Sequence, residues 1–235
     1  MKRHIPNVFT SFNLFSGCIA TVMAFQGEYA WVVVWVIAAA FFDFCDGFSA
    51  RLLKAYSPMG KELDSLADVI SFGIAPSMAL FHFLSRNIIC ISQHPVITGY
   101  LPYMAFILAV FSALRLAKFN VDKRQSESFI GLNTPANALF WVSFCYGLVH
   151  DAPMITPLLM YTVLVAILVF SSLMVSEIPM FSLKVKNIKF KGNEYRYFLI
   201  IFMIGLTAYI GILGIAGGIL LYIAMSIINS RTQTE

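Results

Sequence analysis

Residues 41–76 read FFDFCDGFSARLLKAYSPMGKELDSLADVISFGIAP and place Asp43, Asp46, Asp64 and Asp68 among mostly apolar neighbours. An ionisable residue well inside a membrane helix costs about 2.5–3.5 kcal/mol on insertion scales. Several carboxylates this close together in the chain therefore need an interaction that offsets the cost. Bound cations are the most direct one.

Helical spacing predicts that these carboxylates gather in space. One helix face carries four positions at i, i+3, i+4 and i+7, namely Asp43, Asp46, Gly47 and Ala50, and a second face carries Gly60, Asp64 and Asp68. A chain reversal at Ser57-Pro58 makes the two helices antiparallel, so their carboxylate faces can meet. The glycines and the alanine on those faces are small and leave room for a ligand, although small residues also let helices pack closely.

The chemistry of the donor set favours a hard divalent cation. Oxygen ligands without Cys or His suit Mg²⁺ or Mn²⁺, and two such ions about 3.5–4 Å apart form a phosphoryl-transfer clamp. The alternative is that the acids form interfacial salt bridges with Arg51, Lys54 and Lys61. Residue chemistry alone leaves both interpretations open.

The composition outside this stretch is that of a membrane protein. The chain is 59% hydrophobic and 12% charged, about half the charged share of a soluble domain, and its mean hydropathy is +0.80. The net charge of +4 comes from basic clusters between apolar runs, which favours membrane topology and argues against nucleic-acid binding. We expect one all-α domain over residues 1–235, a polytopic transmembrane bundle.

Runs of about 20 apolar residues predict about eight spans. They lie near residues 8–26, 30–53, 60–85, 97–119, 133–150, 154–176, 195–211 and 214–230. The last two form one apolar run that is too long for a single crossing. A tight turn that divides it is expected among Gly211, Gly214, Gly217 and Gly218. With both termini in the cytoplasm, every Lys and Arg except Arg86 lies on the cytoplasmic side, as the positive-inside rule requires. The carboxylates would then lie near the cytoplasmic face.

The opening stretch resembles the signature of the CDP-alcohol phosphatidyltransferase family, D-x2-D-G-x2-A-R-x8-G-x3-D-x3-D. Every fixed position matches, namely Asp43, Asp46, Gly47, Ala50, Arg51, Gly60, Asp64 and Asp68. The resemblance implies that the four aspartates bind two divalent ions and that Asp68 is also the general base. It implies further that the small residues border CDP-diacylglycerol and that Arg51 faces phosphate. Positive-inside topology alone would also explain Arg51.

Several shorter motifs are similar to the phosphatidylserine synthase branch of this family. They are residues 5–10 (IPNVFT), 13–17 (NLFSG), 113–120 (ALRLAKFN), 129–132 (FIGL) with 135–136 (PA), and 173–184 (LMVSEIPMFSLK). Asn133 departs from the proline that these enzymes often carry. Asn7 and Thr10 are expected to contact the CDP moiety, and helix capping is the alternative.

L-serine is the acceptor that this branch implies. Serine carries a carboxylate and an ammonium, so its site needs a cation and acceptors. Arg115 is the expected partner for a carboxylate or phosphate, with a snorkelling arginine as the alternative. Asn120 and Asn133 are further candidates.

We therefore expect transfer of the phosphatidyl group of CDP-diacylglycerol to serine, with release of CMP. We also expect membrane lipid contact, a homodimer, and a bacterial or archaeal plasma membrane location with a cytoplasmic active site. A sister enzyme that uses glycerol 3-phosphate or an inositol phosphate would keep the signature. A divalent-cation transporter would place its carboxylates near the bilayer midplane, and a non-enzymatic scaffold has no specific support.

Overall fold

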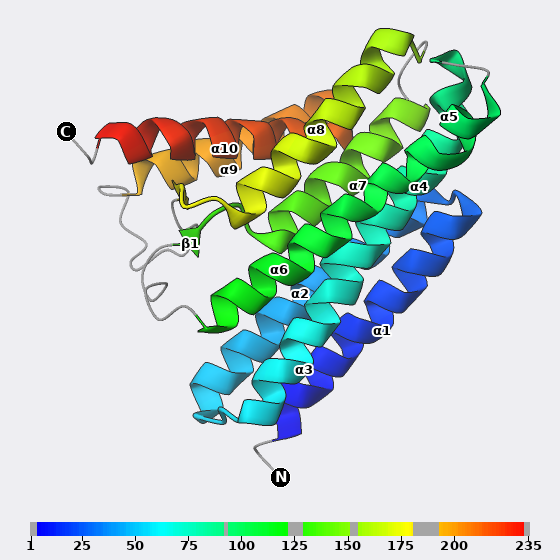
Figure 1. Cartoon of the computed structure of the whole chain (residues 1–235). Coiled ribbons are helices and arrows are strands. Elements are labelled where there is room, and N and C mark those ends of the chain that lie inside the picture. The colour runs from blue at the N-terminus through cyan, green and yellow to red at the C-terminus, as the bar shows by residue number, and fades with distance from the viewer. Residues whose placement is uncertain (1–3, 92–93, 122–128, 151–154, 181–192, 233–235) are drawn as a thin grey trace.

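The computed structural model describes residues 4–91, 94–121, 129–150, 155–180 and 193–232, and these fold into a bundle of helices (Figure 1). The helices in chain order are α1 (Ile5–Gln26), α2 (Tyr29–Leu53), α3 (Pro58–Asp68), η2 (Val69–Ile74), α4 (Ala75–Asn87), η3 (Ile88–Cys90), α5 (Pro95–Tyr100), η4 (Leu101–Phe106), α6 (Ile107–Val121), α7 (Thr134–His150), α8 (Pro157–Val175), α9 (Glu194–Ile210) and α10 (Leu213–Thr232). Two short strands, β1 (Phe129–Ile130) and β2 (Pro179–Met180), complete the fold.

The predicted all-α architecture is confirmed, and each predicted span coincides with a helical segment. Within the described residues, five segments are long and apolar enough to cross a membrane, namely Ile5–Gln26, Tyr29–Leu53, Pro58–Cys90, Thr98–Val121 and Pro157–Val175. The apolar helices Tyr195–Ile210 and Leu213–Ile228 are shorter. A total of eight spans with both termini in the cytoplasm remains a prediction.

The third predicted span is one rod, but it is not a plain α-helix. After Asp68 the chain makes a π-helical turn, η2, in which the backbone N–H of Ala75 donates to the carbonyl of Ile70 five residues earlier. Pro76 follows directly and has no N–H to offer to the carbonyl of Phe72, so the regular ladder is broken at this point. Such π turns are frequent at functional sites, and this one begins directly after the candidate site residue Asp68.

The outer faces of the first two helices are strongly apolar. On α1, Phe12 and Phe15 are exposed, and on α2 the same holds for Phe41, Phe44 and Phe48. The buried residues of α1 and α2 are mostly small or β-branched, and the two helices lie side by side (Figure 1). Small inner residues and large apolar outer residues are the pattern of helices packed in lipid. The chain is therefore an integral membrane protein.

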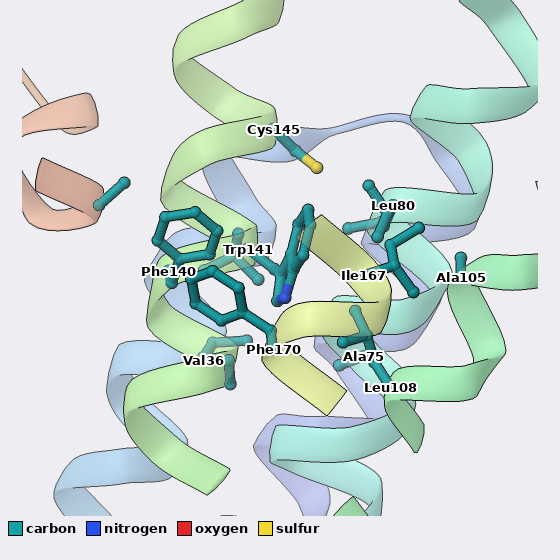
Figure 2. Close-up of a cluster of buried hydrophobic side chains, with 14 of the residues drawn as sticks. Val36, Ala75, Leu80, Ala105, Leu108, Phe140, Trp141, Cys145, Ile167 and Phe170 are labelled. Carbon is teal, nitrogen blue, oxygen red and sulfur yellow. The ribbon is translucent and has the colours of Figure 1, made fainter. Parts of the chain in front are cut away.

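The centre of the bundle is packed around Trp141 of α7, a fully buried side chain. Figure 2 shows its indole among side chains from α4, α6 and α8, including Leu80 and Ile167. Phe140 stacks on Phe170 with ring centroids 4.2 Å apart, and Trp141 meets the same Phe170 edge-on at 5.5 Å. This aromatic core fixes α7 between its neighbours, and α7 begins at Thr134 on the side of the carboxylates.

The predicted division of the last apolar run is confirmed at Gly211, which separates α9 from α10. Gly211 has φ 67° and ψ −153°, a region of the backbone map that is essentially restricted to glycine. Figure 1 shows α9 and α10 at a steep angle to the other long helices. Of the two, α10 packs against α7 and β2.

The strands β1 and β2 form an antiparallel pair with Phe129 opposite Met180 and Ile130 opposite Pro179. The N–H of Gly131 extends this contact by donating to the carbonyl of Ile178 at 2.9 Å. Two motifs that the sequence presents separately, at 129–132 and from 173 onward, thus pack on each other. Together they connect the start of α7 to the end of α8.

Candidate active site

The signature carboxylates lie where α2 and α3 face each other. Lys54 ends α2 in the left-handed conformation, with φ 50°, and Ser57 caps α3 by accepting from the N–H of Gly60 at 3.0 Å. This short connection makes the helices antiparallel, as predicted. Asp43, Asp64 and Asp68 each offer a carboxylate oxygen, and these atoms all lie within 4.8 Å of one another.

The fourth acid, Asp46, lies beside this group and is held from α1. Its Oδ2 accepts a hydrogen bond from the Thr10 hydroxyl at 2.7 Å. Thr10 also lies 3.1 Å from the carbonyl of Pro6 in its own helix, but a hydroxyl has one proton, and the shorter contact to a carboxylate is the stronger one. Thr10 is therefore buried against the site, and the structure gives its side chain a role other than helix capping.

The donor set fits a divalent cation better than it fits salt bridges. Among the residues that the structure describes, Asp46, Asp64 and Asp68 make no ion pair with Lys or Arg. The ammonium of Lys61 instead donates to the carbonyl of Asn120 at 2.8 Å. The Oδ1 of Asp64 is buried and accepts no hydrogen bond. A buried carboxylate oxygen without a donor is costly, and direct coordination of a cation would satisfy it.

A cavity of about 640 Å³ adjoins the acids. Its lining includes Asp46 and Asp64 and all the residues that the sequence assigned to CDP-diacylglycerol: Asn7, Thr10, Gly47, Ala50, Arg51 and Gly60. These residues come from the start of α1, the end of α2 and the start of α3. The structure therefore brings the whole predicted nucleotide set together around one space next to the carboxylates.

The residues predicted to bind the acceptor, Arg115, Asn120 and Asn133, do not line this cavity. Arg115 of α6 is 7% exposed, its Nη1 donates to the Thr134 hydroxyl at 3.1 Å, and it interacts electrostatically with Asp68 and Asp43. Its Nε is buried without a hydrogen-bond partner. The guanidinium thus points into the protein, toward the carboxylate cluster, and it is not a snorkelling arginine.

The two asparagines proposed for the acceptor already have structural partners. Asn120 donates from Nδ2 to the Ser65 hydroxyl at 2.8 Å and so links α6 to α3. Asn133 precedes α7, and its Oδ1 accepts from the N–H of Ala136 at 2.9 Å, the arrangement of a helix N-cap. Contact between either residue and an acceptor remains a prediction.

Comparison with known proteins identifies the family. Residues 3–180 match the model of the CDP-alcohol phosphatidyltransferases. The chain belongs to the CDP-alcohol phosphatidyltransferase family. The matched range contains every predicted site residue, and it ends at Met180, so that α9 and α10 lie beyond it.

Individual family members extend this finding. A CDP-diacylglycerol–serine O-phosphatidyltransferase of Helicobacter pylori is 34% identical over 139 residues, which cover 58% of this chain and 55% of the relative. An enzyme of the same name from Bacillus subtilis is 33% identical over 152 residues, or 62% of this chain and 78% of the relative. One from Methanocaldococcus jannaschii is 34% identical over 141 residues, or 60% of each protein. The chain spans about half the length of the Helicobacter relative that it matches.

The sequence analysis includes Asn13 in the motif at residues 13–17 but gives its side chain no role in the site. Asn13 is fully buried in α1, and its Nδ2 donates to Oδ1 of Asp68 at 3.0 Å. A signal was present, because Asn13 lies three residues after Thr10 on the same face of an otherwise apolar helix. Buried amides in such helices are rare enough to need a partner.

A second missed neighbour comes from outside the range that matches the family. Tyr222 of α10 is 3% exposed and interacts electrostatically with Arg115. Neither the spacing nor the local motif around Tyr222 predicts this proximity, because it arises from the packing of α10 against α7.

Proposed function

We propose that this protein transfers the phosphatidyl group of CDP-diacylglycerol to the hydroxyl of L-serine and releases CMP. The observation that carries the proposal is the single cavity in which the expected nucleotide contacts adjoin the carboxylate cluster. The names of the relatives, which are serine O-phosphatidyltransferases, support serine as the acceptor.

The carboxylates have the roles that the family signature implies. Asp43, Asp46, Asp64 and Asp68 would hold two divalent ions, Mg²⁺ or Mn²⁺, which when bound neutralise the charge of a pyrophosphate and make its phosphorus more electrophilic. Thr10 orients Asp46 through its hydrogen bond. Arg51 lines the cavity with a charged, exposed side chain and is suited to a phosphate oxygen.

The reaction is an in-line displacement at phosphorus. Asp68 accepts the proton of the serine hydroxyl, the serine oxygen forms a bond to the β-phosphorus, and the bond from that phosphorus to the oxygen of CMP breaks. CMP leaves with the electron pair of the broken bond. The small residues Gly47, Ala50 and Gly60 keep the cavity open for the nucleotide, and the acyl chains stay in lipid beside the exposed apolar face of α2.

The charge around Arg115 favours serine over a phosphorylated alcohol. One turn further along α6, Lys118 is paired with Glu177 and also donates to the carbonyl of Val175, so its charge is largely balanced. Among the residues that the structure describes, Arg115 is the one buried cation, which matches the single carboxylate of serine. Glycerol 3-phosphate carries nearly two negative charges and would call for more cations.

The setting of the enzyme follows from the positive-inside pattern and from family resemblance. We infer eight spans, cytoplasmic termini, a bacterial or archaeal plasma membrane and an active site open to the cytoplasm. CDP-diacylglycerol would reach the cavity sideways from the inner leaflet. A homodimer is the expected assembly.

The test is a reconstituted assay. Purified protein in lipid nanodiscs receives CDP-diacylglycerol, Mn²⁺ or Mg²⁺, and serine, glycerol 3-phosphate or an inositol phosphate, and both CMP and the lipid product are measured. We expect phosphatidylserine with serine, and no product after chelation. Asp64→Asn should lose nearly all activity, whereas Glu62→Gln, an exposed acid of the same helix, should stay close to wild type. Near-normal turnover in a metal-free sample would refute the mechanism, and product with glycerol 3-phosphate alone would refute the acceptor.

A further inference from the structure

A side-chain hydrogen bond joins Asn13 of α1 to Asp68, the candidate general base. The Asn13 amide donates from Nδ2 to Oδ1 of Asp68 at 3.0 Å. Asn13 is 0% exposed and Asp68 is 8% exposed, so the bond is shielded from water. A hydrogen bond to one oxygen restricts rotation of the carboxylate and so fixes the directions in which its remaining lone pairs meet a ligand.

The backbone around this bond is fixed independently of the amide. The hydroxyl of Ser71, three residues after Asp68, donates to the main-chain carbonyl of Asn13 at 3.0 Å. One turn further along α1, Gly17 touches Ser71 so closely that a Cβ on Gly17 would lie 2.2 Å from the Ser71 hydroxyl. Through these contacts the π turn η2, which follows Asp68 directly, packs against α1.

The Asn13 amide is therefore not needed to join the two segments. Its own carbonyl oxygen, Oδ1, is buried and has no hydrogen-bond partner. An apolar side chain of similar size would fill the same space without leaving that oxygen unpaired. What only the amide supplies is a neutral donor to Asp68, which orients the carboxylate without cancelling its charge.

We propose that Asn13 is a positioning residue that holds Asp68 for cation binding and for acceptance of the acceptor's proton. This inference rests on the proposed function, because it assigns Asn13 a role only through Asp68. It makes α1 part of the catalytic machinery at two points, through Thr10 on Asp46 and through Asn13 on Asp68.

The decisive variant is Asn13→Leu, which keeps the approximate volume and removes the donor. Partners that orient metal-binding carboxylates typically contribute 10–100-fold to metal affinity or activity. We expect Mn²⁺ affinity, measured by titration calorimetry without substrate, to fall by about 10–100-fold. The kcat for CMP release should fall as well, while the KM for CDP-diacylglycerol stays near its wild-type value.

Ser71→Ala is the matched control, because it removes the hydrogen bond from η2 to the main-chain carbonyl of Asn13 and leaves the bond from the Asn13 amide to Asp68 of α3 in place. It should retain Mn²⁺ affinity and kcat even where its melting temperature falls. If Asn13 only stabilised the fold, Asn13→Leu and Ser71→Ala would lower the melting temperature in parallel and leave the Mn²⁺ affinity of the folded protein unchanged. That result would overturn the inference.

The failure of this inference can be separated from failure of the proposed function. If the wild-type protein uses serine and the Asn13→Leu variant has the Mn²⁺ affinity and kcat of the wild type, only the role of Asn13 is refuted. If the wild-type protein prefers another alcohol, the serine assignment is refuted. The kcat of Asn13→Leu is then compared with that of the wild type in assays with that alcohol. Wild-type protein that binds no Mn²⁺ refutes both.

Discussion

Replacement of Arg115 by lysine keeps a positive charge and removes the planar guanidinium. In the structure this guanidinium is 7% exposed, bonds to Thr134 through Nη1, and lies over the ring of Phe119 with 5.8 Å between Cζ and the ring centroid. Its Nε has no partner. A lysine ammonium is a compact charge that cannot reproduce two parallel hydrogen bonds to a carboxylate or phosphate.

The expected loss follows from one charge-assisted hydrogen bond. Such a bond contributes about 1.5–3 kcal/mol, and each 1.36 kcal/mol corresponds to a tenfold change in rate. Arg115→Lys should therefore lower kcat/KM by about 10- to 150-fold. The free energy of unfolding should change by less than the activation free energy does, because lysine retains the positive charge near Asp68 and Asp43.

The assay is steady-state CMP release with serine and CDP-diacylglycerol varied in turn. A loss that appears mainly as a higher KM for serine assigns Arg115 to the serine carboxylate. A lower kcat with a higher KM for CDP-diacylglycerol assigns it to phosphate. Arg86→Lys, in the last turn of α4, is the control and should match wild type. Wild-type constants for both substrates in Arg115→Lys would remove this residue from the site.

Three further predictions concern other parts of the molecule. Thr10→Val removes a buried hydroxyl that donates to the carboxylate of Asp46 and should lower kcat/KM by about 10- to 150-fold. Thr10→Ser keeps the hydroxyl and should retain most activity. Equal losses in the two variants would contradict the role of the hydrogen bond. Gly211→Ala forces a residue with a Cβ into a region of the backbone map that is nearly exclusive to glycine. It should lower the free energy of unfolding by about 1–3 kcal/mol, which is measured as a lower melting temperature. Gly205→Ala is the control and should not destabilise the protein, because a Cβ added there meets no other atom. In a cysteine-free background, Asp122→Cys should react with an impermeant label from the cytoplasmic side and His94→Cys from the opposite side, and reversed labelling would invert the proposed topology.

Much of the site could be predicted because helical spacing is a strong geometric constraint. Residues at i, i+3 and i+4 share a face wherever the helix forms, so Asp43, Asp64 and Asp68 converge once the reversal at Ser57-Pro58 is recognised. The assignment of the nucleotide came from the family resemblance, but the position of Gly47 and Gly60 in the cavity lining follows from helical spacing, because each is fixed relative to the acids along its own helix.

The remainder depends on contacts between distant segments. The local sequence indicates that a buried Asn13 needs a polar partner, but it does not indicate that this partner is Asp68, 55 residues later. It also does not indicate that the side chain of Asn133 forms a helix cap. The π turn was also missed, because the apolar pattern of residues 60–85 is compatible with an unbroken α-helix. Its cause, Pro76, is visible in the sequence, but the consequence depends on how η2 is seated against α1.

The approach of Tyr222 to Arg115 joins a helix outside the matched family range to the candidate site. The helices that carry the carboxylates and line the nucleotide cavity all lie within residues 3–180, whereas Tyr222 belongs to the hairpin of α9 and α10 beyond that range. Substitutions on the inner face of α10 should therefore alter the surroundings of Arg115 and, through Arg115, the electrostatic environment of Asp68 and Asp43. Tyr222 and its neighbours Ile219 and Ile223 also belong to the hydrophobic core, so variation in this hairpin can adjust the surroundings of Arg115 only as far as the packing of α10 is kept.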